Sequence, residues 1–222
     1  MTFLEICQKV REKVGVSGVG PTAVTSQTGA HLRIVNCVIE AWREIQASSD
    51  AWKFMVKDGT LSLGAGTQTY SLSTITGSLP LYGSMIAGTL KFSTGARLTY
   101  KTWEQWEAED IDLGTEQGQP NLWTEDSDRA IRFYKIPDAT YSLRFRYRRS
   151  PQVLAANNDE PVCPAAFHMA IVYRAALMYA ELDEAPDLAR LLLPEWQTWS
   201  AKLEHDQLPT LTHAPSRFRS VR

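Results

Sequence analysis

The sequence predicts an α+β protein in which helices from both ends of the chain form one bundle and an antiparallel β domain is inserted between them. Two observations predict this fold: apolar residues recur at helical spacing near both termini, and short strand-like runs fill the middle. Two helix pairs bury their apolar stripes most simply against each other. We therefore expect a bundle from 1–50 and 161–206, a sandwich or small barrel over 51–160, and an extended basic tail over 207–222.

The N-terminal pair carries clear helix signals. A first helix is expected over Thr2–Val14, because Thr2 and Glu5 have the spacing of a capping box. A loop rich in glycine follows, and a second helix is expected over Gly29–Ser48. Each of these helices has one apolar face and should bury only that face.

The middle of the chain reads as short strands separated by turns. Residues 52–72 predict a strand, an Asp-Gly turn, a strand, a Gly-rich turn and a strand. A short helix is expected at Trp103–Glu109, and residues 130–149 predict a β-hairpin around a Pro-Asp-Ala turn. Further strands are expected at 85–92, 96–102 and 121–124.

Two helices are expected again after Pro164. Ala165–Leu182 is apolar almost all round and should be buried on most sides. Asp187–His205 contains Pro194, which should kink or split the helix because proline lacks the amide hydrogen. The tail that follows Asp206 has no acidic residue, which predicts an extended basic segment.

Composition excludes several classes of protein. Cys7, Cys37 and Cys163 are far apart and fit neither a metal site nor a disulfide framework, so we expect buried free thiols in a reducing compartment. No signal peptide or membrane-spanning run is evident, and we expect a soluble protein made in the cytoplasm. No motif names a reaction, a metal or a cofactor, so no enzymatic activity is expected.

Charge is strongly segregated in a chain whose net charge is only −2. Residues 104–128 hold nine acidic residues and no Lys or Arg, and a basic run follows them directly. In that run Arg144, Arg146 and Arg148 alternate with apolar residues and should share one face of a strand. The two blocks could pair between copies of the chain or within one copy, and the sequence leaves both possibilities open. The acidic surface expected to meet a partner comprises Glu104, Glu107, Glu109, Asp110 and Asp112.

The arginine face is also a candidate surface for nucleic acid, because arginine can follow phosphates. Phe145 and Tyr147 should lie on the opposite face of the strand, where they cannot stack on bases beside those arginines. Contact with DNA would therefore carry no sequence specificity.

Four segments of the chain resemble the head-to-tail adaptor (connector) proteins of tailed bacteriophages, in particular the tail tubular A and tail-accessory adaptors of short-tailed phages. The first is the helix pair that ends in Trp52-Lys53-Phe54. The others are the run AGTQTYSL at 65–72, the run IRFYKIPDATYSLRFRYRRSP at 131–151, and the acidic turn before a Pro-flanked helix at 158–164. The resemblance covers most of residues 1–205.

This resemblance implies a virion protein assembled in the host cytoplasm and located in the neck or tail. It implies a ring, of about twelve copies, that lies under the portal and extends the channel for double-stranded DNA toward a downstream tail or nozzle protein. The C-terminal segment is expected to dock on the portal. The residues of that segment are Pro209, Thr210, Leu211, Pro215, Arg217, Phe218, Arg219 and Arg222.

Two alternatives remain at this point. The chain could be a tail-completion or neck protein that contacts more distal tail components. It could also be a ligand-binding β domain with helical supports, in which Trp103, Trp106 and Trp123 would form the binding platform.

Overall fold

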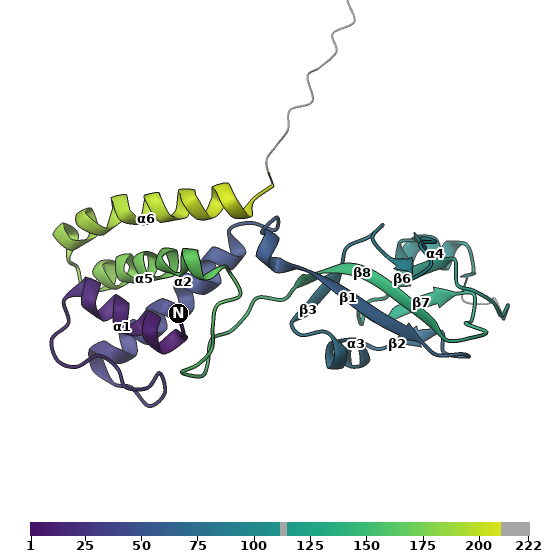
Figure 1. Cartoon of the computed structure of the whole chain (residues 1–222), viewed down its shortest axis with the longest axis horizontal. Helices are drawn as coiled ribbons and strands as arrows, with labels where there is room; N and C mark the ends of the chain where they lie inside the picture. The colour runs from purple at the N-terminus through teal and green to yellow at the C-terminus, as the bar shows by residue number, and fades with distance from the viewer. Residues whose placement is uncertain (112–114, 210–222) are drawn as a thin grey trace, which may run out of the picture. The chain divides into compact units, whose positions relative to one another are not determined.

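The chain forms two compact units. The first comprises residues 1–55 together with the chain from residue 152 onward, and the second comprises Val56–Pro151. The computed structural model, shown in Figure 1, describes residues 1–111 and 115–209. Terminal helices and a central, largely antiparallel β region are present, so the predicted α+β fold class is confirmed.

The helical unit is organised around its most apolar helix, α5 (His168–Leu182). This helix contacts α1 (Phe3–Val14), α2 (Gly29–Ala47) and α6 (Pro186–Gln207), as Figure 1 shows. A 3-10 turn precedes α5 at Ala165–Phe167, and another follows α2 at Lys53–Met55. Because α5 is covered on three sides, its sequence is apolar nearly all round.

Helix boundaries follow the sequence closely at the N-terminus. The predicted capping box is confirmed: the Thr2 hydroxyl accepts a hydrogen bond from the Glu5 amide, and the Glu5 carboxylate accepts one from the Thr2 amide. Of the kink or split expected at Pro194, the split does not occur, since α6 runs unbroken across it. Proline removes one backbone hydrogen bond, but the buried side chains of Leu192 and Leu203 hold both halves of α6 against the same core.

The segment that follows the β unit packs on the helices. Gln46 and Gln152 exchange two hydrogen bonds, in which the Gln46 amide group donates to the Gln152 carbonyl (3.1 Å) and the Gln152 amide donates to Gln46 (2.7 Å). The Phe3 amide donates to the Asp159 carbonyl at 2.7 Å. Residues 152–160, which the sequence suggested to be part of the β domain, therefore lie with the helices.

In the described part of the β unit, the strands form two four-stranded sheets. In the first sheet, β8 (Tyr141–Arg149) lies at the centre. It pairs with β1 (Val56–Leu63) along one edge and with β3 (Tyr82–Met85) and β4 (Lys91–Phe92) along the other. The second sheet has the order β2-β7-β6-β5, and its strands are Thr69–Tyr70, Ile131–Tyr134, Leu122–Glu125 and Thr99–Tyr100. All pairs are antiparallel except β5 with β6.

One hydrophobic core joins the two sheets, as in a β-sandwich. Leu143, Phe145 and Tyr147 of β8 are buried in the same cluster as Trp123 and Phe133 of the second sheet. The period-two alternation of β8 therefore has the predicted result: its apolar side chains face the core and its arginines face outward.

Two local predictions in the β unit are wrong. Residues 130–149 are not a hairpin, because β7 and β8 belong to different sheets. The connection between them bonds elsewhere: the Ile136 amide donates to Glu116, and the Pro137 carbonyl accepts from Gly66. The Asp58-Gly59 pair is not a turn either, since β1 continues through it and the rings of Phe145 and Tyr147 cover Gly59.

The short helices of the β unit were predicted in part. The helix expected at Trp103–Glu109 is confirmed as α4 (Trp103–Ala108). Helix α3 (Leu72–Ser78) was missed, although the Ser71 hydroxyl caps it by accepting from the Thr74 amide. Its composition of Ser, Thr and Gly is typical of a loop, and burial of Ile75 in the core holds it in place.

Candidate interaction surfaces

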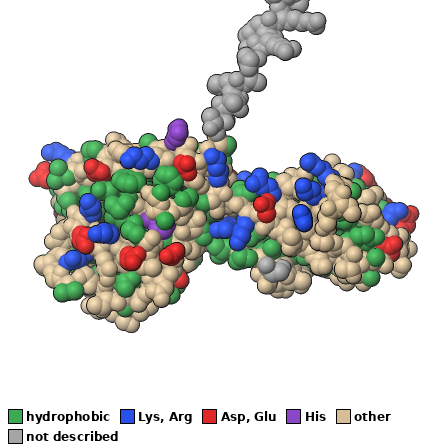
Figure 2. All heavy atoms as spheres, in the orientation of Figure 1, with side chains coloured by type: hydrophobic (Ala, Val, Ile, Leu, Met, Phe, Trp, Pro, Cys, Tyr) green, Lys and Arg blue, Asp and Glu red, His purple; other side chains and the backbone are tan. Residues whose placement is uncertain are grey.

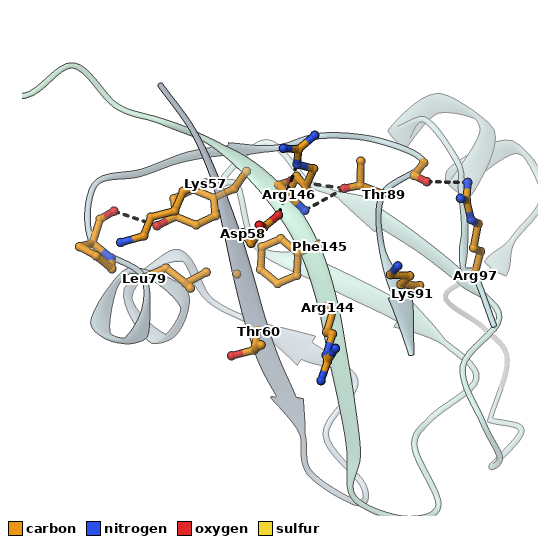
Figure 3. Close-up of a pocket in the computed structure, with 14 residues that line it drawn as sticks. Lys57, Asp58, Thr60, Leu79, Thr89, Lys91, Arg97, Arg144, Phe145 and Arg146 are labelled. Carbon is orange, nitrogen blue, oxygen red and sulfur yellow. Dashed lines mark hydrogen bonds and ion pairs between the residues drawn. The ribbon is translucent and has the colours of Figure 1, made fainter. Parts of the chain in front are cut away.

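The first sheet borders a groove with a volume of about 750 Å³ (Figure 3), whose lining includes the exposed Arg144 and Arg146 and the core residues Leu79, Phe145 and Tyr147. Its walls come from β1, β4, β8 and the loops beside them. The charged side chains that line it are five cations and one acid: Lys57, Lys91, Arg97, Arg144, Arg146 and Asp58. Figure 2 shows Lys and Arg side chains as well as Asp and Glu side chains on the visible face of the β unit. We call this surface the basic groove.

Strand register explains how the cations come together. Lys91 of β4 lies directly opposite Arg144 of β8, and Arg97 lies opposite Lys91. On the other side of Arg144, β1 supplies the neutral Thr60. Lys91, Arg97 and Arg144 therefore form one basic row across the sheet.

The three arginines predicted to share a face differ in their surroundings. Arg146 forms an ion pair with Asp58, its partner in register, at 3.3 Å. Arg148 is half-buried and lies opposite Val56 of β1 and Ser84 of β3. Arg144 is exposed, and neither it nor Lys91 forms an ion pair with any residue that the structure describes. The uncompensated charge of this face is therefore greatest at Arg144.

Much of the acidic segment is neutralised within the chain. Asp126 lies 3.2 Å from Arg132, and it also accepts hydrogen bonds from the amides of Asp128 and Ala130. Two further ion pairs join Glu125 to Arg129 at 3.4 Å and Glu116 to Lys135 at 3.0 Å. The second half of the acidic segment thus pairs with the basic run that follows it.

Helix α4 and its C-terminal turn keep exposed acids. Buried Trp106 anchors α4 to the core, so Glu104 and Glu107 project outward. Hydrogen bonds from the Glu104 backbone amide and the Thr102 hydroxyl lower the pKa of the Glu104 carboxyl. Glu109 pairs with Lys101 at 2.7 Å, whereas Glu104, Glu107 and Asp110 form no ion pair with a described residue. We call these three residues the acidic strip.

Some predicted site residues lie outside the part of the chain that the structure describes. Asp112 and all the predicted portal-docking residues after Pro209 lie outside the described residues. Pro209 itself is exposed just beyond the end of α6. The structure therefore describes no contact of the C-terminal segment.

The described residues hold no arrangement typical of an active site. No group of three or more His, Cys, Asp or Glu side chains could bind a metal within the described ranges. His168 is buried on α5: its Nδ1 accepts from the Met1 amino group at 2.8 Å, and its Nε2 donates to the Cys163 carbonyl at 3.2 Å. Burial raises the pKa of the Cys7 and Cys163 thiols to about 12, which leaves them unreactive.

The aromatic platform expected for a ligand-binding domain is not exposed. Trp106 and Trp123 are buried, and Trp103 packs beneath the guanidinium of Arg132 at 5.2 Å. In the part of the chain that the structure describes, no helix has both the length and the apolar character needed to cross a bilayer.

The chain thus combines a helical unit with an inserted β-sandwich that has charged outer surfaces and buried aromatic residues. The family model for the SU10 adaptor protein matches residues 1–214, and the chain belongs to that family. No curated protein matches the chain. The chain is therefore a phage structural adaptor and a virion component, and membership in the family implies contact with portal and tail components.

Sequence reasoning missed Lys91 and Arg97 as members of the basic face. Lys91 lies in a two-residue strand and Arg97 in a bridge of one residue, so neither has a periodic signal. Only the register of β4 against β8 reveals that these side chains adjoin Arg144.

Proposed function

We propose that this adaptor assembles as a ring, of about twelve copies, between the portal and the tail. The ring extends the channel through which double-stranded DNA passes without sequence specificity, and a downstream tail or nozzle protein binds its far side. Assembly takes place in the host cytoplasm, and the protein has no enzymatic activity. The observation that carries this proposal is the match of an adaptor family to residues 1–214, nearly the whole chain.

The charged surfaces of the β unit support assembly with other chains. The basic row is not neutralised within the described chain, and the acidic strip is likewise exposed. Surfaces of opposite charge on one protein favour head-to-tail contacts, and such contacts close into rings when the rotation permits. The arginine face (Arg144, Arg146 and Arg148) would then lie against a ring neighbour or toward the channel.

Portal binding can be measured with purified components. Mass photometry of the adaptor mixed with the portal of the same virus should give a discrete complex heavier than the portal, by about twelve adaptor masses. Electron microscopy of the portal alone provides the control for an intact ring. Absence of any complex with an intact portal would contradict the proposal and favour a more distal tail role.

The C-terminal segment is proposed to dock on the portal. It is rich in Arg, Pro and Thr and contains no acid after Asp206, which suits a segment that orders on binding. Deletion of residues 209–222 should therefore abolish or strongly weaken portal binding. A variant with the same tail residues in shuffled order is the matched control, because it keeps the charge and length. Unchanged binding of the deletion variant would rule out this docking role.

A further inference from the structure

The basic row places like charges side by side without compensation. Lys91 faces Arg144 and Arg97 faces Lys91 in the strand register. Among the described residues that line the groove, Asp58 is the only acid, and it pairs with Arg146. Like charges directly opposite each other on a sheet are destabilising. An acidic group from outside the chain would relieve this repulsion.

The basic groove is a poor surface for DNA. Phe145 and Tyr147 line the groove, but they are only 3% and 0% exposed, so their rings offer little surface on which a base could stack. Asp58 is highly exposed within the groove and would repel a phosphate. The net charge of −2 also opposes binding to a polyanion. These features favour a protein partner over DNA, because a protein can place single carboxylates beside the cations and away from Asp58.

The chain itself supplies such carboxylates on the acidic strip. Glu104 and Glu107 are three residues apart and thus project from neighbouring positions on α4, with Asp110 in the following turn. No residue of α4 lines the basic groove of its own copy. The acidic strip can therefore meet a basic groove only on a second copy.

We propose that the acidic strip of one copy binds in the basic groove of the next, where Glu104 and Glu107 meet Lys91 and Arg144. Arg97 extends the groove on the side of Lys91, and Asp110 extends the strip. Each copy carries one groove and one strip, so the contact is head-to-tail and can close into a ring. This inference rests on the proposed function, because it identifies the contact between ring neighbours.

Two charge-reversed variants isolate this contact. A groove variant carries Lys91→Glu and Arg144→Glu, and a strip variant carries Glu104→Lys and Glu107→Lys. Neither can form the contact with itself, but the intact strip of the first can bind the intact groove of the second. All four side chains are exposed, so we expect each variant to fold. A well-dispersed amide spectrum of each variant checks this. If a reversal prevents folding, the neutral changes Lys91→Gln and Arg144→Gln replace it.

The test is an NMR titration of the ¹⁵N-labelled strip variant with the unlabelled groove variant. We expect shifts of the amide signals of residues 91, 97 and 144 that decrease at least severalfold in about 0.5 M NaCl, where charges are screened. The matched control is a groove variant that also carries Glu104→Gln and Glu107→Gln, which should cause no such shifts.

Three results would overturn the inference: no shifts with the groove variant, equal shifts with the control, or shifts caused only by a DNA duplex of about 20 base pairs. The titration contains no portal, so its outcome is independent of the portal-binding measurement. If the amide signals of the groove shift but the protein does not bind the portal, the contact between copies stands and the adaptor ring is rejected. If the protein binds the portal but these signals do not shift, the adaptor role stands and this contact is rejected.

Discussion

Removing the central charge of the basic row should stabilise the isolated chain. In Arg144→Gln the guanidinium is replaced by a neutral side chain that still covers the sheet, and the repulsion with Lys91 disappears. Like charges opposite each other on a sheet destabilise by a few tenths of a kcal/mol to about 1 kcal/mol, so we expect a gain of about 0.5 kcal/mol at low salt. For a unit of roughly 100 residues this raises Tm by about 2–4 °C.

The matched control is Arg146→Gln, two residues along the same strand. Its guanidinium is paired with Asp58 at 3.3 Å, so its loss should leave stability unchanged or lower it slightly. Thermal unfolding followed by circular dichroism at about 0.02 M and 0.5 M NaCl measures both variants against the parent chain. A gain for Arg144→Gln that persists at high salt, or a loss at low salt, would refute the claim that the basic row is uncompensated.

Three further predictions concern the two units. In the β unit, Gly83→Ala should lower stability by about 2 kcal/mol or more in chemical denaturation, because its Cβ would lie 2.6 Å from the Arg148 carbonyl oxygen; Gly77→Ala, with open space around it, should be close to neutral. In the helical unit, burial and the Met1 amino group lower the pKa of His168. As the pH falls, the unfolded chain therefore binds a proton at this histidine at a higher pH than the folded chain does. Stability should therefore fall as the pH drops below about 6.5, and His168→Gln should reduce this dependence in urea titrations at pH 7.5 and 5.5; an unchanged pH dependence would contradict the assignment. Cys7, Cys37 and Cys163 are buried, so native protein should react with Ellman's reagent at least a hundredfold more slowly than protein in urea, and fast reaction of one thiol would show that its site opens.

The sequence predicted those elements whose signals are local. Thr2 and Glu5 predicted the start of α1 through their capping-box spacing, whereas the capping box of Thr102 and Gln105 at α4 was identified only in the structure. The alternation of Leu143, Phe145 and Tyr147 with arginines placed β8 correctly, because a strand with one buried face must show that pattern.

The errors arose where distant contacts outweigh local propensity. Asp58-Gly59 is typical of a turn, yet eight paired residues of β8 hold β1 extended. The Pro-Asp-Ala run resembles a hairpin turn, yet it carries the chain between two sheets because Leu143 and Phe133 must each face the shared core.

The basic groove could be predicted only in part for the same reason. Arg144 and Arg146 are visible as a pattern along one strand, whereas Lys91 and Arg97 join them through pairing between strands. The intramolecular pairs of Asp126 with Arg132 and of Glu116 with Lys135 were one of two possibilities that the charge blocks left open. The structure assigns these pairs to the fold, whereas Glu104, Glu107 and Asp110 form no ion pair with a described residue.

The most direct test of this account is a cryo-electron microscopy reconstruction of the neck of the tailed particle. We predict a ring of copies between the portal and the tail, into which the helical unit and the β unit each fit as separate bodies, with α4 of one copy beside β4 and β8 of the next. Density for this protein elsewhere in the virion, or no density in the neck, would contradict the account.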